Sequence, residues 1–277
     1  MHPFSINTDK SLGPVPFGSS RGMTDVYLFD LDCLAHSQDR SVDRELADAL
    51  GVWAQSHPCY IMSSRHYSGV VSRLSEEFQA QLSGVFASSG TDFWVGDNSE
   101  NQAEHVFCDE VYEFLSQVVR KCAYPDKVPP LIDCGPGSMR LCLIGRNPTA
   151  AQRQAFHAFD AEHRDMRRIQ DEFRLRFPEY RIFEDRSCGL LIERVSVDSS
   201  LIAGEINMRH RNARIIAFAG EAEIEGYAAP LWQQFASHTG IAVSGPSDVW
   251  QLLRYEQRRH EEHGTGTKAP RPQFEEA

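Results

Sequence analysis

Two carboxylates one residue apart, Asp30 and Asp32, follow the apolar run from Val26 to Phe29. Such a run is typical of a strand that is buried on both faces of a sheet. Ligands of open α/β sheets bind at the carboxyl edge of the strands, where both aspartates are expected. The pair suits Mg2+, a hard cation that prefers oxygen ligands. A strand that ends in a solvated turn has the same pattern, so the pair alone leaves both interpretations open.

The segments around this pair alternate between strand and helix. Apolar runs predict short buried strands at 59–62 and 85–87, in addition to the strand at 26–30. Apolar residues at spacings of three and four predict a helix that opens at Ser41, and a second helical segment covers 67–82. This β-α-β-α-β order is the pattern of a parallel, doubly wound sheet.

The pattern changes after Asp97 and returns at about residue 197. The intervening elements predict an α+β insert. They are helices over 106–124 and from Pro148 to about 177, and strands at 131–133, 140–144, 180–183 and 189–195. A very apolar strand at 214–219 and a shorter one at 241–243 then continue the parallel sheet.

We therefore predict an α/β fold, with a doubly wound parallel core and an inserted α+β cap. The core is expected to comprise 22–100 and 197–260, and the cap 101–196. Residues 1–21 are rich in Gly, Pro and Ser and have no periodicity, which predicts a flexible arm. The polar segment 261–277 predicts a flexible tail.

Composition excludes several classes of function. The formal net charge of -11 disfavours a broad nucleic-acid or anionic-membrane surface. No apolar run is long enough to span a membrane, and the N-terminus lacks the apolar core of a signal peptide. The seven cysteines are scattered, without a CxxC pair, so neither a zinc site nor a disulfide framework is indicated. We expect a reduced, cytoplasmic protein.

Five segments, in this order, resemble the haloacid dehalogenase superfamily of phosphotransferases. The closest resemblance is to the eukaryotic-type phosphomannomutases and related sugar-phosphate phosphatases. The segments are Phe29-Asp30-Leu31-Asp32, Ile61-Met62-Ser63-Ser64-Arg65, Ile144-Gly145-Arg146-Asn147 with the helix after it, Phe218-Ala219-Gly220-Glu221 and Gly245-Pro246-Ser247-Asp248. The resemblance implies a Rossmann-like core and an inserted α+β cap.

The resemblance also implies roles for individual residues of the core. Asp30 would attack phosphorus and form an aspartyl phosphate. Asp32 would protonate the leaving oxygen and later activate water or a sugar hydroxyl. Phosphate would be bound by Ser63, with Ser64 beside it, and by Ser199.

The implied substrate and metal sites involve the cap and the fourth segment. Arg146 and Arg153, with Arg140 adding to the same patch, would bind the substrate, because a guanidinium fork suits a phosphate. Mg2+ would stabilise the charge of the transferring group. The implied metal ligands are Asp30, Asp32, Glu221 and Glu225.

The sequence departs from the family pattern at several positions. Cys33 stands where the first motif usually has glycine, and Ser199 stands where the third motif has lysine. Glu221 and Glu225 replace the aspartates of the fourth motif. Gly135 lies near the position of the family's first cap arginine.

We expect a Mg2+-dependent phosphatase or phosphotransferase that acts on a small phosphorylated sugar or nucleotide. Because the family's lysine is missing, the alternative is a catalytically silent protein that binds a phosphorylated ligand or a protein partner. Phosphomannomutase activity is a further alternative. The oligomeric state does not follow from the sequence.

Overall fold

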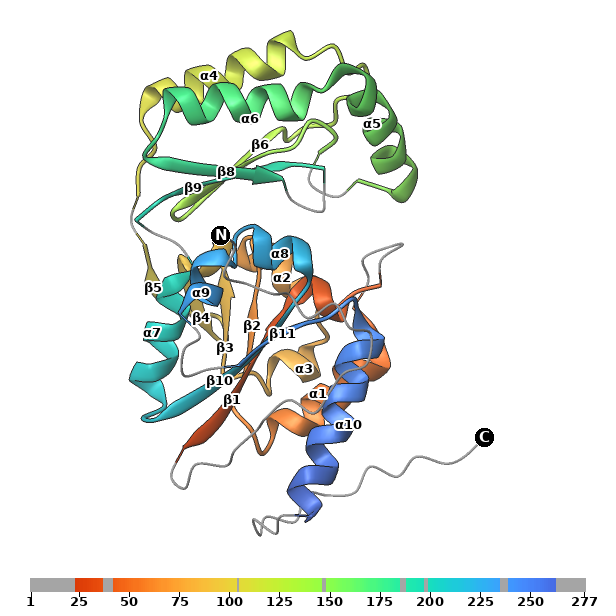
Figure 1. The fold of residues 1–277 in the computed structure, drawn as a ribbon, viewed down its shortest axis with the longest axis vertical. Coiled ribbons are helices and arrows are strands. Elements are labelled where there is room, and N and C mark those ends of the chain that lie inside the picture. The colour runs from red at the N-terminus through yellow and green to blue at the C-terminus, as the bar shows by residue number, and fades with distance from the viewer. Residues whose placement is uncertain are drawn as a thin grey trace, which may run out of the picture.

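The computed structural model describes residues 23–36, 42–103, 105–145, 148–184, 188–196, 199–234 and 239–262. Two sheets organise these residues (Figure 1). The larger sheet has seven strands in the order β11-β10-β1-β2-β3-β4-β5. Its strands are β1 (Thr24–Asp30), β2 (Cys59–Met62), β3 (Gly84–Ala87), β4 (Asp92–Val95), β5 (Asn98–Gln102), β10 (Ala213–Ala219) and β11 (Thr239–Ala242).

The centre of this sheet is parallel, as the sequence predicted. β1 pairs in parallel with β10 on one side and with β2 on the other, and β3 and β11 extend the parallel arrangement. β4 and β5 then add an antiparallel edge that the sequence analysis did not anticipate. All five residues of β5 are exposed. This strand therefore carries no apolar alternation from which it could have been predicted.

Successive side chains of β1 enter two different cores, because side chains alternate between the faces of a strand. Tyr27 and Phe29 pack with the helices of one face, whereas Val26 and Leu28 pack with those of the other. The first face is covered by α1 (Arg44–Ala54), α2 (Tyr67–Val71), α3 (Glu76–Gln79) and α10 (Pro246–Glu262). The second face is covered by α7 (Ser200–Arg209) and α9 (Ala229–Gln233). The sheet is thus doubly wound.

The smaller sheet is antiparallel and has four strands in the order β6-β7-β9-β8. They are β6 (Ile132–Gly135), β7 (Ser138–Leu141), β8 (Tyr180–Glu184) and β9 (Leu190–Arg194). Helices α4 (Asp109–Lys121) and α6 (Asp165–Arg176) lie on the side that faces away from the larger sheet, and α5 (Ala150–His163) lies at one end of the smaller sheet (Figure 1). Phe156, Ile169 and Phe173 from these helices belong to a separate core cluster between the helices and the smaller sheet. The two phenylalanines are therefore core residues of the insert.

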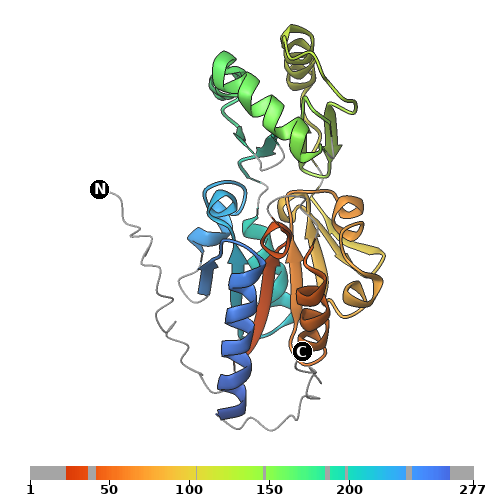
Figure 2. The ribbon, with the colours of Figure 1, turned by 90° about the vertical axis from the view of Figure 1, so that its right-hand side faces the viewer.

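The smaller sheet lies at one end of the larger one (Figure 2). Arg140 on β7 donates to Ser64, which follows β2, so this end is the carboxyl edge of the parallel strands. The residue boundaries predicted for the core and the cap remain a prediction. The predicted arm at 1–21 lies outside the described residues, as does the predicted tail beyond Glu262, where α10 ends.

Two predicted helices are each divided in two. The segment 67–82 forms α2 and α3, because Ser75 begins a new helix by accepting a hydrogen bond from the Phe78 N–H. The helix predicted to run to 177 breaks at Arg164, whose φ of 55° is left-handed. Asp43, rather than Ser41, caps α1.

Within the described residues, we find no helix that combines the length and the apolar character required to cross a membrane.

Candidate active site

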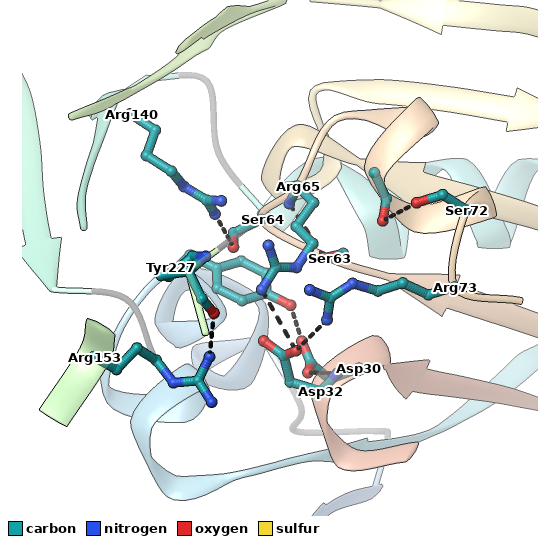
Figure 3. A network of polar contacts seen from close by, with 12 residues as sticks. Asp30, Asp32, Ser63, Ser64, Arg65, Ser72, Arg73, Arg140, Arg153 and Tyr227 are labelled. Atoms are coloured by element: carbon teal, nitrogen blue, oxygen red, sulfur yellow. Dashed lines mark hydrogen bonds and ion pairs between the residues drawn. The ribbon is translucent and has the colours of Figure 1, made fainter. Parts of the chain in front are cut away.

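Asp30 is the last residue of β1 and is 2% exposed. Its Oδ1 accepts a hydrogen bond of 2.8 Å from the Asp32 N–H, which caps a short 3-10 helix at Leu31–Leu34. Its Oδ2 accepts a hydrogen bond from the hydroxyl of Tyr227 (Figure 3). The parallel sheet thus brings this carboxylate to its carboxyl edge, and hydrogen bonds to both oxygens fix its orientation.

Asp32 faces two arginines that the sequence analysis did not assign to the site. Its Oδ1 lies 3.9 Å from an Nη of Arg65 and 3.6 Å from an Nη of Arg73. Arg65 follows β2, whereas Arg73 follows α2. Both guanidinium groups point at the aspartate pair in Figure 3. They place positive charge at this edge in a chain whose net charge is -11.

Ser63 and Ser64 lie at the end of β2, next to the aspartates. Ser63 is buried, and its hydroxyl accepts a hydrogen bond of 3.2 Å from the Arg65 N–H. The Ser63 hydroxyl keeps a proton that it can donate in a hydrogen bond to phosphate. That role of Ser63 remains a prediction. Ser64 instead accepts a hydrogen bond of 3.0 Å from Arg140.

Arg140 and Arg153 extend from the insert toward the core (Figure 3). Arg140 is 7% exposed although it carries a guanidinium. Arg153 lies in the first turn of α5 and donates a hydrogen bond of 2.7 Å to the carbonyl of Pro148. Arg146, the third predicted substrate ligand, lies outside the described residues. Substrate binding by all three arginines remains a prediction.

Ser199 is fully buried and does not lie open to the site. Its hydroxyl donates to the carbonyl of Tyr227 at 2.7 Å and accepts from the Leu231 N–H at 3.3 Å. It therefore joins the start of α7 to the segment that carries Tyr227. The phosphate contact predicted for Ser199 is not favoured by this geometry, because both bonds go to backbone groups.

The predicted metal ligands do not come together in the part of the chain that the structure describes. Glu221 and Glu225 are exposed on α8 (Glu221–Glu225). Among the described residues, no group of three His, Cys, Asp or Glu side chains could hold a metal ion. Asp30 and Asp32 fit Mg2+ by donor type, but the set of four predicted from the sequence is not assembled.

The hairpin of β6 and β7 touches the core beside the site. The Nε2 of His66 lies 3.3 Å from Asp133 Oδ1, and its Nδ1 lies 3.1 Å from the hydroxyl of Ser88. A Cβ on Gly135 would come within 2.2 Å of the His66 ring. Glycine at this position therefore lets the two parts of the chain approach closely.

The sequence analysis missed Arg73 and Tyr227 for different reasons. Arg73 lies within a segment that reads as one amphipathic helix, where an arginine is usually a solvated residue. Tyr227 is 197 residues from Asp30 in sequence and belongs to no motif. Of the described residues that contact the aspartate pair from outside the predicted site, only Arg65 belongs to a sequence motif, since it ends the second one.

The doubly wound sheet, the aspartate pair at its carboxyl edge and the inserted α+β unit define the class: the chain has the fold of the haloacid dehalogenase superfamily. Comparison with protein-family models and with curated proteins found no match. The evidence for the fold comes from solved structures.

Three solved structures illustrate the similarity. A sugar phosphatase of haloacid dehalogenase subclass IIB has a TM-score of 0.53 at 14% identity, covering 87% of this chain and 99% of that one. An IMP-nucleotidase from Plasmodium falciparum has a TM-score of 0.53 at 12% identity, covering 86% and 69%. A trehalose-6-phosphate phosphatase from Aspergillus fumigatus has a TM-score of 0.50 at 15% identity, covering 85% and 93%. The fold implied by the sequence resemblance is thus confirmed.

Proposed function

We propose that this protein is a phosphatase that hydrolyses a small phosphomonoester, a sugar phosphate or a nucleotide, through an aspartyl phosphate on Asp30. The observation that carries the proposal is the aspartate pair at the carboxyl edge of the sheet, faced by the buried Arg65 and by Arg73. The similar structures include a sugar phosphatase, a nucleotidase and a trehalose-6-phosphate phosphatase, which supports the same class of substrate.

The chemistry divides between the two aspartates. A carboxylate oxygen of Asp30 forms a bond to phosphorus while the bond from phosphorus to the ester oxygen breaks. The ester oxygen takes a proton from the Asp32 carboxyl group and leaves as an alcohol. Water then attacks the phosphorus of the aspartyl phosphate and gives a proton to the Asp32 carboxylate. This second step releases inorganic phosphate and restores Asp30.

Mg2+ is the cofactor that we propose, because carboxylate oxygens are its usual protein ligands. When bound, it would stabilise negative charge on the transferring group. The described residues do not assemble the predicted ligand set, so nucleophilic attack and proton transfer are assigned to protein groups alone. Phosphate release measured in EDTA and at increasing Mg2+ tests the cofactor separately from the nucleophile.

The decisive experiment measures phosphate release from p-nitrophenyl phosphate and a panel of sugar phosphates and nucleotides. Asp30→Asn should lower the rate by about 1000-fold or more, because an amide oxygen is a poor nucleophile. Asp48→Asn removes the same charge from an exposed position on α1 and serves as the matched control. Equal turnover by Asp30→Asn and the parent protein would remove the proposed mechanism. Mannose 1-phosphate in the panel, analysed for mannose 6-phosphate, tests the mutase alternative.

A catalytically silent, phosphate-binding protein is the second candidate. It is favoured by one observation: both oxygens of Asp30 already accept hydrogen bonds, one of them from the buried Tyr227. Such a protein would gain thermal stability from a phosphorylated ligand, because a ligand that binds only the folded state stabilises it. A ligand-dependent rise in Tm without turnover of any compound in the panel would favour this candidate.

A further inference from the structure

Arg65 is a buried cation without a close anionic partner among the described residues. It is 6% exposed, and the ion-pair oxygen of Asp32 lies 3.9 Å from its Nη. Its Nε has no hydrogen-bond partner within the described part of the chain. Burial of a charged group is costly unless the group is paired and hydrogen-bonded. The Arg65 guanidinium is thus poised for an anion that approaches more closely than Asp32.

Arg73 shares the same carboxylate oxygen. Its Nη lies 3.6 Å from Asp32 Oδ1, and that oxygen accepts no hydrogen bond from the described residues. Two guanidinium groups therefore meet one oxygen, each beyond hydrogen-bond distance. A carboxylate in this position balances charge without forming a close bidentate pair with Arg65.

Other arginines of this chain show what an ion pair with short contacts looks like here. Arg214 binds Asp25 through two contacts of 2.7 and 2.5 Å. Arg209 donates to Glu205 at 2.9 Å. Arg65 and Arg73 have no such contact with Asp32, although both surround it. The difference points to a binding site rather than to a salt bridge optimised for stability.

We propose that Arg65 and Arg73 bind the phosphoryl group, exchanging Asp32 for its non-bridging oxygens when substrate occupies Asp30. The inference rests on the proposed function and extends it to two residues. The two arginines supply the positive charge that Ser199 lacks, and they reach the phosphoryl group from the β2 side of the sheet. Ser199 cannot supply this charge, and its hydroxyl is committed to backbone groups.

The exchange has a second consequence, because it couples substrate binding to the state of Asp32. While the arginines face Asp32, its carboxylate is neutralised by them. Once they turn to the phosphoryl oxygens, the Asp32 carboxylate is released, takes a proton from water and gives that proton to the leaving oxygen. Asp32 and phosphate therefore compete for the same two guanidinium groups.

The test uses the full-length protein and two readouts: the Kd of inorganic phosphate by calorimetry, and kcat and KM for the best substrate in the panel. Arg73→Met should weaken phosphate binding by about tenfold or more and lower kcat/KM by about 100-fold. Arg73→Lys should fall between Arg73→Met and the parent, because it keeps the charge but loses the fork. Arg167→Met removes one positive charge from a side chain that is 83% exposed on α6, and should match the parent.

A double-mutant cycle separates binding from a merely structural role. Asp32→Asn should tighten phosphate binding in the parent, because the competing carboxylate is gone. In the Arg73→Met background that gain should shrink, since only one guanidinium remains to be released. At Arg65 the variant to use is Arg65→Lys, which keeps the charge, because Arg65→Met would remove a charge from a buried position that tolerates its loss poorly.

The outcomes distinguish the two proposals. If the parent is active and binds phosphate, and folded Arg73→Met has the same activity and the same phosphate Kd, the role of Arg73 is overturned. The proposed function would then still stand. Additive effects of Asp32→Asn and Arg73→Met on the phosphate Kd would overturn the exchange. A parent protein that neither binds phosphate nor hydrolyses any phosphomonoester would overturn the proposed function and this inference together.

Discussion

The hydroxyl of Tyr227 donates a hydrogen bond to Oδ2 of Asp30, the oxygen that the Asp32 N–H leaves available. Tyr227 lies between α8 and α9, and its own carbonyl accepts from buried Ser199. The segment after β10 thus reaches across to the end of β1. The Tyr227 hydroxyl therefore holds one specific oxygen, Oδ2, of the proposed nucleophile Asp30.

Removing the Tyr227 hydroxyl should raise the rate of the proposed reaction. Asp30 loses negative charge as its oxygen bonds to phosphorus, so a hydrogen bond to the carboxylate stabilises the ground state more than the transition state. A hydrogen bond to a charged group is worth about 1.5 to 3 kcal/mol, and part of this stabilisation remains in the transition state. We therefore expect Tyr227→Phe to increase kcat by about tenfold. Single-turnover phosphate release provides the measurement. A decrease in kcat would instead mean that the hydroxyl holds Asp30 in the productive orientation.

Arg140 should act mainly on substrate binding, because it reaches the core from the insert. Its contact with the Ser64 hydroxyl is 3.0 Å long, and its side chain is buried. We expect Arg140→Met to raise KM by about tenfold, and to lower kcat less, if the guanidinium holds the part of the substrate that does not react. Arg120→Met, on the exposed face of α4, is the control. Equal effects of Arg140→Met and Arg120→Met on KM would contradict a binding role.

The tight contact at Gly135 predicts that even one methyl group disturbs the approach of the hairpin to the core. Gly135→Ala would place its Cβ 2.2 Å from the His66 ring, which contacts Asp133 and Ser88. Such overpacking costs about 1 to 3 kcal/mol. We expect faster amide hydrogen exchange in the hairpin 132–141 and a lower Tm.

A second substitution shows whether the ring is the cause. In the His66→Ala background, Gly135→Ala should cost much less than in the parent, because the colliding atoms are gone. Gly204→Ala is the matched control, since its Cβ meets no atom within 4 Å. If Gly135→Ala lowers the Tm as much without the His66 ring as with it, the collision with that ring is not the cause.

The central strands could be predicted from sequence because a strand that is buried on both faces consists mainly of apolar residues. β10 is apolar over nearly its full length and β1 is apolar from Val26 to Phe29, which is typical of a sheet covered on both faces. The fixed order of strands and helices then placed the ends of β1 and β2, and with them Asp30 and Ser63, at one edge.

The contacts around the site could not be predicted in the same way. Arg73 reaches Asp32 only because α2 ends after Val71 instead of continuing to residue 82. Tyr227 reaches Asp30 through tertiary packing that no local periodicity records. Arg164 breaks a helix by a left-handed φ that an arginine rarely adopts, so nothing in its sequence signals the break.

The pair formed by His210 and Tyr60 should make the stability of the fold depend on pH. The Nε2 of His210 lies 2.8 Å from the Tyr60 hydroxyl, behind the strand β2 that leads to Ser63. Burial, followed by the charge of Arg209, lowers the pKa of His210 below its ordinary value of 6.5. Burial also raises the pKa of Tyr60 to about 12, so its hydroxyl keeps its proton at neutral pH.

The sign of the pH dependence follows from these directions. Between the lowered folded-state pKa of His210 and the unfolded value, the unfolded chain binds more protons, so the free energy of unfolding rises with pH. The contribution of His210 is present above pH 6.5 and is lost as pH falls through the folded-state pKa. Urea unfolding of the parent and of His210→Gln, from pH 5 to 8, should show a smaller loss on acidification in the variant. His163→Gln makes the same change at the exposed end of α5 and should keep the slope of the parent. Parallel pH profiles for the parent and His210→Gln would show that this half-buried histidine does not control acid stability.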